Sequence, residues 1–272
     1  MSTKKDRFTK KDKLYMNLAY KLARARFGQT GINPSVGCVI VKGDEILSIG
    51  QTGFNGRPHA ETNAINGSLQ KVNGAKMYIT LEPCNHYGKT PPCTNLIIKK
   101  KIKEVFYSIN DIDKKVSGKS FKILKSKKIS VKKGLLAREV SKFYESYFYN
   151  RKHKLPYVTG KLAISKNNLI YSKGVKRITD IQSDKLTHYL RYQNDSILIS
   201  YKTLNCDNPR LDCRINGLSK YSPIKIILDN KLQSKVNSYL FRKIKNKNII
   251  IFYNKADSSK IRLFKKKKNK FN

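Results

Sequence analysis

The 272-residue sequence lacks any apolar run long enough to cross a bilayer, which takes about 20 consecutive apolar residues. Its first residues, MSTKKDRFTKKDK, are charged and are not followed by the hydrophobic segment of a secretory signal. Cysteines are few, and the five present lack the dense, even spacing of a secreted disulfide scaffold. We therefore expect a cytoplasmic protein with no membrane partner, in which thiolates are available to bind a metal.

Acidic residues are also scarce, because 18 Asp and Glu stand against 58 Lys and Arg and leave a formal net charge of +40. A charge of this size would ordinarily indicate a nucleic-acid partner. Here, however, lysine greatly outnumbers arginine and is scattered over both halves, whereas nucleic-acid readers concentrate charge on one face and use arginine for bidentate contacts. We interpret the excess as a coding bias tolerated on a solvated surface and predict no specific nucleic-acid partner.

The first half of the chain alternates strand and helix patterns. Residues 36–50 form two β-rich runs joined by a Gly-Asp turn and are typical of a hairpin. The other predicted elements are helices over 12–27, from His59, over 91–101, over 118–127 and over 135–154, and strands over 76–81, 104–109 and 129–133. Such alternation predicts an α/β layered domain with a largely parallel sheet beyond the hairpin.

The second half repeats the alternation after a linker. Residues 151–165, RKHKLPYVTGKLAIS, contain a charged stretch and a proline and are expected to lead into a strand. Further elements are predicted as a helix over 180–193 and strands over 196–200, 223–229 and 248–254. The final residues 264–272, FKKKKNKFN, lack an apolar pattern and are expected to pack against nothing. We thus predict two domains, 1–150 and 151–272.

Two segments of the first half carry metal-ligand side chains. HAETNAI places His59 and Glu61 two positions apart, and TLEPCNHYGKTPPC supplies Cys84 and Cys93 about twenty residues later. A catalytic zinc site uses three nitrogen or sulfur ligands and leaves the fourth position for water. Cys93 begins a predicted helix, whose partial positive charge stabilises the thiolate that binds metal. We predict that His59, Cys84 and Cys93 bind zinc.

Glu61 is the predicted catalytic residue of this site. Zinc lowers the pKa of its water to about 7, and a nearby carboxylate can take that proton and return it to a leaving amine. The segments match the H-x-E…P-C-x-x-C pattern of zinc deaminases, although the second cysteine comes nine positions after the first, not three. The predicted reaction is hydrolytic deamination.

Less specific interpretations of the same residues remain open. One histidine and two cysteines also occur by chance as a surface imidazole and two buried thiols, and His86 could compete with His59 as a ligand. Cys38 lies inside the apolar run VGCVIV and is expected to be a small core residue. Cys206 and Cys213 have no partner pattern.

The long cysteine spacing carries a family resemblance. TLEPCNHYGKTPPC, with NPSVGCVIV upstream and HAE between them, contains every fixed letter of P-C-x-H-x-G-x-T-P-P-C. It closely resembles the deaminase half of the bifunctional riboflavin-biosynthesis family, which joins a diaminohydroxyphosphoribosylaminopyrimidine deaminase to a 5-amino-6-(5-phosphoribosylamino)uracil reductase. The resemblance implies a cytidine-deaminase-like three-layer domain that acts on 2,5-diamino-6-(5-phosphoribosylamino)pyrimidin-4(3H)-one. It implies substrate contacts from Asn33, His86, Lys89 and Thr90.

Later segments resemble the reductase half of that family. They are PYVTGKLAISKNN, ITDIQSDKLTHYLR and TLNCDNPRLDCR, and they imply an incomplete dihydrofolate-reductase-like α/β domain that uses NADPH. The cofactor residues implied by the resemblance are Ala163, Thr203, Asp207 and Asn230. The substrate residues implied are Arg191, Leu211 and Arg214, and arginine suits a phosphoribosyl group because its guanidinium binds phosphate bidentately.

Two departures from the family affect the reductase half. Where the family has Ser-x-Trp-Ile-Thr, this chain has Val-Lys-Arg-Ile-Thr at residues 175–179. No glycine-rich turn of the Glu-Gly-Gly type, which would cradle the cofactor phosphates, follows Asp229. We therefore expect a C-terminally truncated reductase half with impaired NADPH-dependent reduction. The resemblance also implies a homo-oligomer.

Two other functions stay open from the sequence. A tRNA or nucleoside deaminase of the same superfamily would suit the charge, but the long cysteine spacing and the second domain disfavour it. A basic, zinc-stabilised RNA-binding remnant without catalysis is an alternative of a different class.

Overall fold

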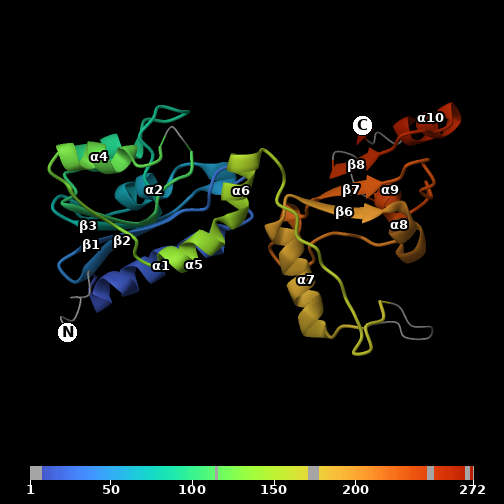
Figure 1. The fold of residues 1–272 in the computed structure, drawn as a ribbon, viewed down its shortest axis with the longest axis horizontal. Coiled ribbons are helices and arrows are strands. Elements are labelled where there is room, and N and C mark those ends of the chain that lie inside the picture. The colour runs from blue at the N-terminus through green and yellow to red at the C-terminus, as the bar shows by residue number, and fades with distance from the viewer. Residues whose placement is uncertain (1–7, 114–115, 171–177, 244–247, 267–269, 272) are drawn as a thin grey trace. The chain divides into compact units, whose positions relative to one another are not determined.

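The computed structural model describes residues 8–113, 116–170, 178–243, 248–266 and 270–271 (Figure 1). It divides into two compact units, residues 1–160 and 161–272. The boundary predicted at residues 150 and 151 falls inside the helix α6 (Glu145–His153), and the division comes later, after Gly160. None of the helices in the described ranges has the length and apolar character of a membrane span.

The first unit is built on a five-stranded sheet. Its strands are β1 (Gly37–Lys42), β2 (Glu45–Gln51), β3 (Lys76–Leu81), β4 (Glu104–Ile109) and β5 (Ser130–Lys133). They lie in the order β2-β1-β3-β4-β5. β1 runs antiparallel to β2 and β3, whereas β3, β4 and β5 are parallel. The predicted hairpin, and the parallel sheet beyond it, are confirmed.

Helices cover both faces of this sheet and make three layers. They are α1 (Lys10–Arg26), α2 (Ala60–Asn66), α3 (Cys93–Lys99), α4 (Lys119–Ser126) and α5 (Ala137–Phe143). In Figure 1, α1 and α5 lie on one side of the strands and α2 and α4 on the other. The helix α1 begins with a capping box, in which Thr9 and Asp12 each accept a hydrogen bond from the other's backbone N–H.

Alternate residues of the central strands supply two separate cores, because successive side chains of a strand point to opposite faces. Met77 and Ile79 of β3 pack with Ala64 of α2. On the opposite face, Tyr78 stacks on Phe106 with ring centroids 4.5 Å apart, under α1. The metal-ligand helices α2 and α3 belong to the first of these cores.

The helix predicted over 135–154 is wrong as a single element. The chain forms α5 and α6, which meet at Tyr144. This side chain is buried, and its hydroxyl donates to the Ser35 carbonyl at 2.7 Å and lies 2.8 Å from Thr80 Oγ1. These bonds join residues far apart in sequence, so a local pattern does not reveal them.

The second unit has its own parallel sheet. Its strands are β6 (Ser196–Ser200), β7 (Ile224–Leu228), β8 (Ile249–Phe252) and β9 (Lys270–Phe271), in that order. The helices are α7 (Ile181–Gln193), α8 (Tyr201–Asp207), α9 (Tyr239–Lys243) and α10 (Ser258–Lys266). Ile227, Ile251, Leu240 and Phe264 form a core with no exposed surface.

Two expectations for the second unit are wrong. The linker at residues 151–165 was expected to lead into a strand, but residues 155–170 contain no strand. The end of the chain does pack, since Phe264 of α10 is buried against Phe241 with ring centroids 5.1 Å apart. β9 also pairs with β8. Phe264 follows Ile261 by three residues, which is the spacing of one helix face.

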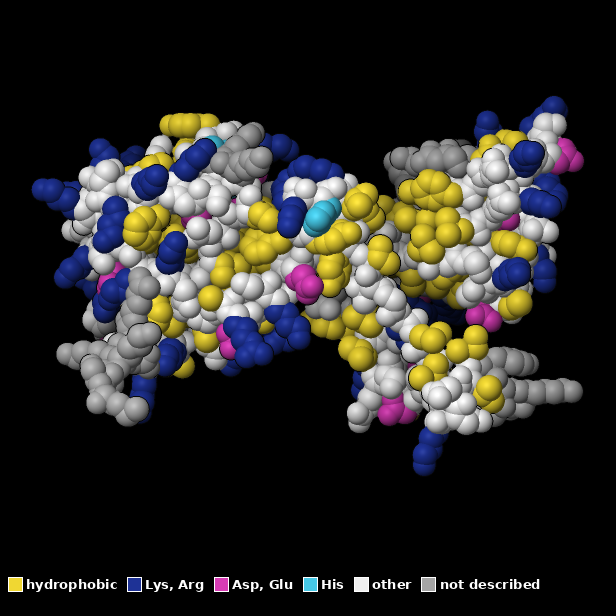
Figure 2. Space-filling model, viewed as in Figure 1, with side chains coloured by type: hydrophobic (Ala, Val, Ile, Leu, Met, Phe, Trp, Pro, Cys, Tyr) yellow, Lys and Arg dark blue, Asp and Glu magenta, His cyan; other side chains and the backbone are white. Residues whose placement is uncertain are grey.

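Basic side chains show no single dense cluster on the face drawn in Figure 2. Lys and Arg are spread over both units there and are interrupted by apolar and uncharged side chains. The absence of a specific nucleic-acid partner stays a prediction.

The contact between β2 and α2 gives a stability prediction. A Cβ at Gly50 would overlap the backbone of Ala60 and Ala64. We expect Gly50→Ala to lower the free energy of unfolding by about 1–3 kcal/mol, because overpacking forces the backbone to shift. Urea unfolding followed by circular dichroism measures this.

The matched control is Gly160→Ala, because a Cβ there meets no atom within 4 Å. It should leave stability unchanged or raise it by up to about 1 kcal/mol. Equal stability of the two variants would contradict the close packing of α2 on β2.

Candidate metal centre

Three ligand side chains from separate elements meet at one point. His59 is the N-cap of α2, Cys84 lies in the loop after β3, and Cys93 is the first residue of α3. Their ligand atoms all lie within 4.8 Å of one another. The Nδ1 atom of His59 is 3.5 Å from Cys84 Sγ and 3.4 Å from Cys93 Sγ. The structure thus brings the three predicted ligands together.

The spacing of these atoms fits a zinc ion. Tetrahedral zinc has bonds of about 2.3 Å to sulfur and 2.0–2.1 Å to nitrogen, which place a sulfur and a nitrogen ligand about 3.5 Å apart. The two distances from His59 Nδ1 have this value. One nitrogen and two sulfurs are also a donor set that zinc prefers in catalytic sites.

The pKa values of the two thiols are shifted in opposite directions. A hydrogen bond from Cys93 lowers the pKa of Cys84 to about 4, and the imidazole of His59 acts in the same direction. The same hydrogen bond, together with burial, raises the pKa of Cys93. The Cys93 backbone N–H also donates to Cys84 Sγ at 3.3 Å. Cys84 is therefore held as a thiolate, the form that binds metal.

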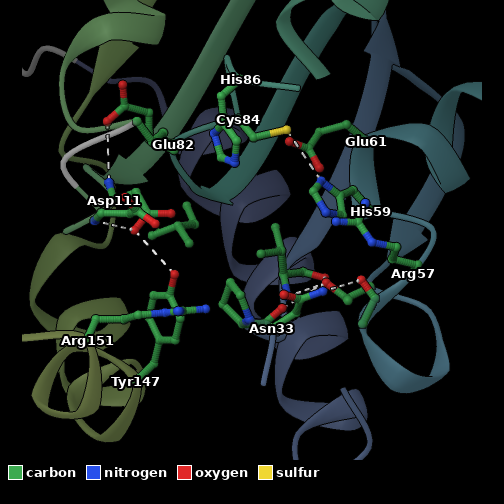
Figure 3. A pocket seen from close by; sticks show the side chains of 17 residues that line it. Asn33, Arg57, His59, Glu61, Glu82, Cys84, His86, Asp111, Tyr147 and Arg151 are labelled. Atoms are coloured by element: carbon green, nitrogen blue, oxygen red, sulfur yellow. Dashed lines mark hydrogen bonds between the residues drawn. The ribbon is translucent and has the colours of Figure 1, made fainter. Parts of the chain in front are cut away.

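Glu61 lies beside these ligands but is not one of them. It is in the first turn of α2 and is 4% exposed. Figure 3 shows its carboxylate next to Cys84 and His59. Burial first, and then the negative charge of Cys84, raise its pKa to about 7. A carboxyl group with such a pKa can both accept and donate a proton near neutral pH.

A cavity of about 130 Å³ opens at this centre. Of the four substrate residues implied by resemblance, Asn33 and His86 line it, whereas Lys89 and Thr90 do not. The Asn33 side-chain amide donates to the Gly56 carbonyl at 3.1 Å and so holds the loop that leads to His59. His86 is outside the group of three metal ligands, and its buried Nδ1 has no hydrogen-bond partner in the described structure.

Several residues that line the cavity were not singled out from the sequence. They are Arg57, Glu82, Asp111, Tyr147 and Arg151. Asp111 follows β4. Its place at the carboxyl end of a predicted parallel strand could have indicated a site residue, because ligands bind at that end of parallel sheets. Arg57 was visible in the Gly-Arg-Pro turn before His59. Tyr147 and Arg151 come from α6, which no local pattern connects with the cavity.

Glu82 fixes the wall of the cavity opposite the metal ligands. Its carboxylate accepts hydrogen bonds from the backbone N–H groups of Asp111, Gly118 and Ser120 at 3.3, 2.9 and 3.1 Å. Glu82 is 3% exposed, and burial raises its pKa against the opposing effect of these bonds. The bonds tie the loop after β4 to the motif that contains Cys84.

The other cysteines take no part in the centre. Cys38 of β1 is fully buried in the core, as expected, and burial raises its pKa. Cys206 is exposed and Cys213 is buried, and both are free thiols.

In the second unit, the implied substrate residues lie close together. Arg191 of α7 donates to the Asp212 carbonyl at 3.2 Å, and Arg214 donates to the Asp212 carboxylate at 2.7 Å. Leu211, between them in sequence, is buried.

The implied cofactor residues are spread over three segments of that unit. Thr203 and Asp207 lie on α8, Asn230 follows β7, and Ala163 lies in the stretch without regular structure. The departure noted at residues 175–177 lies outside the described residues.

The zinc content of two variants shows which of the two candidate histidines, His59 or His86, is a metal ligand. We expect His59→Ala to lose most of its zinc, because it removes the only nitrogen donor of the group. His86→Ala serves as the control and should keep one zinc per chain. Mass spectrometry of the purified full chain measures the metal, and zinc loss only in the His86 variant would contradict the assignment.

Two family models match this chain. The cytidine and deoxycytidylate deaminase zinc-binding region matches residues 9–109, and the RibD C-terminal domain matches residues 156–269. The first contains the metal ligands, and the second contains the implied reductase residues.

Curated relatives and a solved structure match one or both of these parts. The riboflavin biosynthesis protein RibD of Bacillus amyloliquefaciens is 41% identical over 81% of this chain and 60% of its own length. The diaminohydroxyphosphoribosylamino-pyrimidine deaminase of Buchnera aphidicola subsp. Schizaphis graminum is 46% identical over 54% of this chain and 99% of its own length.

The crystal structure of the Thermotoga maritima diaminohydroxyphosphoribosylaminopyrimidine deaminase/5-amino-6-(5-phosphoribosylamino)uracil reductase superposes with a TM-score of 0.82. It is 34% identical and covers 89% of this chain and 70% of that one. The chain thus spans about 60% of the Bacillus relative and 70% of the Thermotoga one. From the metal-ligand motif, both domain matches and these likenesses, the chain belongs to the RibD family of bifunctional riboflavin biosynthesis proteins.

Proposed function

We propose that the first unit catalyses the hydrolytic deamination of 2,5-diamino-6-(5-phosphoribosylamino)pyrimidin-4(3H)-one. The observation that carries this proposal is the meeting of His59, Cys84 and Cys93, with the buried carboxylate of Glu61 beside them and outside the ligand set. The similarity to the Buchnera deaminase extends over 99% of that protein and supports the choice of substrate.

Glu61 carries the proton transfers of this reaction. Zinc, when bound by the three ligands, activates a water molecule as a Lewis acid. The Glu61 carboxylate accepts a proton from water while the water oxygen bonds to the ring carbon that bears the amine. The same carboxyl group then donates that proton to the amine nitrogen, the carbon–nitrogen bond breaks, and ammonia leaves. A pKa of about 7 suits both transfers.

In this proposal Asn33 and His86 orient the pyrimidine, because each offers an unused hydrogen-bonding atom. The amide nitrogen of Asn33 is bonded to Gly56, and its Oδ1 accepts no hydrogen bond from any described residue. That oxygen can therefore accept from a ring N–H. The buried Nδ1 of His86 has no partner among those residues either, and a substrate hydrogen bond would satisfy it.

The catalytic role of Glu61 is tested by Glu61→Gln. This variant keeps the shape of the side chain but cannot accept a proton, so ammonia release should fall by at least about 10²-fold. Zinc content should not change, because Glu61 is outside the ligand set. Loss of zinc in this variant would contradict the assigned role.

Product analysis of the wild-type chain distinguishes the alternatives. Ammonia from the phosphoribosyl pyrimidine supports the proposal, and inosine formed in tRNA would support the tRNA deaminase. Retained RNA affinity without either product would support a non-catalytic remnant.

The reduction step of the family belongs to the second unit. That NADPH serves as its cofactor follows from the family. We propose that Arg191 and Arg214, which both donate to Asp212, bind the phosphate of the substrate. Impaired reduction stays a prediction, as do the cytoplasmic location and the homo-oligomer.

Oxidation of NADPH with the deaminated product should be slow or absent, and turnover that keeps pace with ammonia release would contradict this.

A further inference from the structure

Arg57 places a positive charge in the cavity without a negative partner. The residue lies two positions before His59, is half-buried and lines the cavity. No carboxylate of the described residues lies within 4.0 Å of its guanidinium. Removing a charge from water without a partner is costly, so a half-buried cation in a ligand cavity favours an anionic ligand.

The guanidinium is held in place from the loop that contains the metal-ligand motif. Its Nη1 donates to Thr90 Oγ1 at 2.5 Å. Its Nη2 lies against Gly88, where an added Cβ would be 3.5 Å away. A guanidinium has five N–H donors, so this anchor leaves others for a ligand. A fixed donor group loses less conformational entropy when the ligand binds.

Arg151, the other arginine of the cavity, is differently placed. Its guanidinium lies over the Tyr147 ring, 5.3 Å from the centroid, and donates to the Ile32 carbonyl at 3.3 Å. Figure 3 shows it at the same end of the cavity as Asp111, whereas Arg57 lies at the other end, beside His59. The carboxylate near Arg151 disfavours an anion there. Arg57 is the better site for one.

We propose that Arg57 binds the phosphate of the substrate and that Thr90 positions its guanidinium, so that the centre selects phosphorylated over unphosphorylated pyrimidines. This inference rests on the proposed deaminase function. The planar fork of arginine matches phosphate oxygens bidentately. Thr90 does not line the cavity itself. Its function is to hold the guanidinium of Arg57, which does line it.

The test compares two substrates, the phosphoribosyl pyrimidine and its dephosphorylated form, by steady-state ammonia release from the full chain. Arg57→Ala should lower kcat/KM for the phosphorylated substrate by about 10- to 100-fold, the range for loss of a charged hydrogen bond. The dephosphorylated substrate should lose less than about 2-fold, since the missing interaction is with phosphate. Arg138→Ala removes an exposed charge from the same unit and should change neither value.

Thr90 variants test the positioning role separately. Thr90→Val should raise KM for the phosphorylated substrate alone, with little change in kcat, and Thr90→Ser should restore the wild-type value because it keeps the hydroxyl. Arg57→Lys should fall between wild type and Arg57→Ala, because lysine keeps the charge but not the fork.

Binding of ribose 5-phosphate, measured by calorimetry, is independent of turnover. The wild-type chain should bind it more tightly than Arg57→Ala does, and ribose should not distinguish the two proteins. If this difference appears but no ammonia is released, the deaminase function fails and the anion site stands. If Arg57→Ala affects both substrates equally, or ribose 5-phosphate does not distinguish the proteins, the inference is overturned.

Discussion

The first unit depends on bringing an imidazole and two thiols, carried by three separate segments, to a single cation. The ligands lie at the N-terminal ends of α2 and α3 and in the loop after β3. Their positions are set by how closely the helices approach the sheet, and Gly50 permits the approach of α2. The backbone N–H of Cys93 then links the two cysteine segments through Cys84 Sγ. The packing of α2 and α3 therefore also determines the geometry of the metal ligands, since a displaced helix would separate them.

The sequence was sufficient for those parts of the fold that local patterns determine. The strands β3, β4 and β6 have the bounds predicted from short apolar runs, and the metal ligands followed from residue type and spacing. The helix break at Tyr144 was missed because it depends on hydrogen bonds to Ser35 and Thr80. The strand into which residues 151–165 were expected to lead is absent from residues 155–170, because a strand also needs a pairing partner that the local sequence does not supply.

The candidate site was predictable only in part, for the same reason. His59 could be found in the sequence because metal chemistry constrains the ligand types and their spacing, whereas His86 was implied only by the family resemblance. The opposite wall of the cavity comes from the end of β4 and from α6, and only the folded chain brings Asp111 and Tyr147 to it. Lys89 and Thr90 belong to the motif, yet they lie outside the cavity lining, and Thr90 instead contacts Arg57. Membership of a motif thus did not specify which side chains face the ligand.

X-ray absorption at the zinc edge tests the central claim most directly, because it reports the ligand atoms of the metal in the full chain. The structure predicts two sulfur neighbours at about 2.3 Å and one imidazole nitrogen at about 2.0–2.1 Å, with a light atom in the fourth position. A shell of only nitrogen and oxygen, or of four sulfurs, would show that His59, Cys84 and Cys93 do not share one ion.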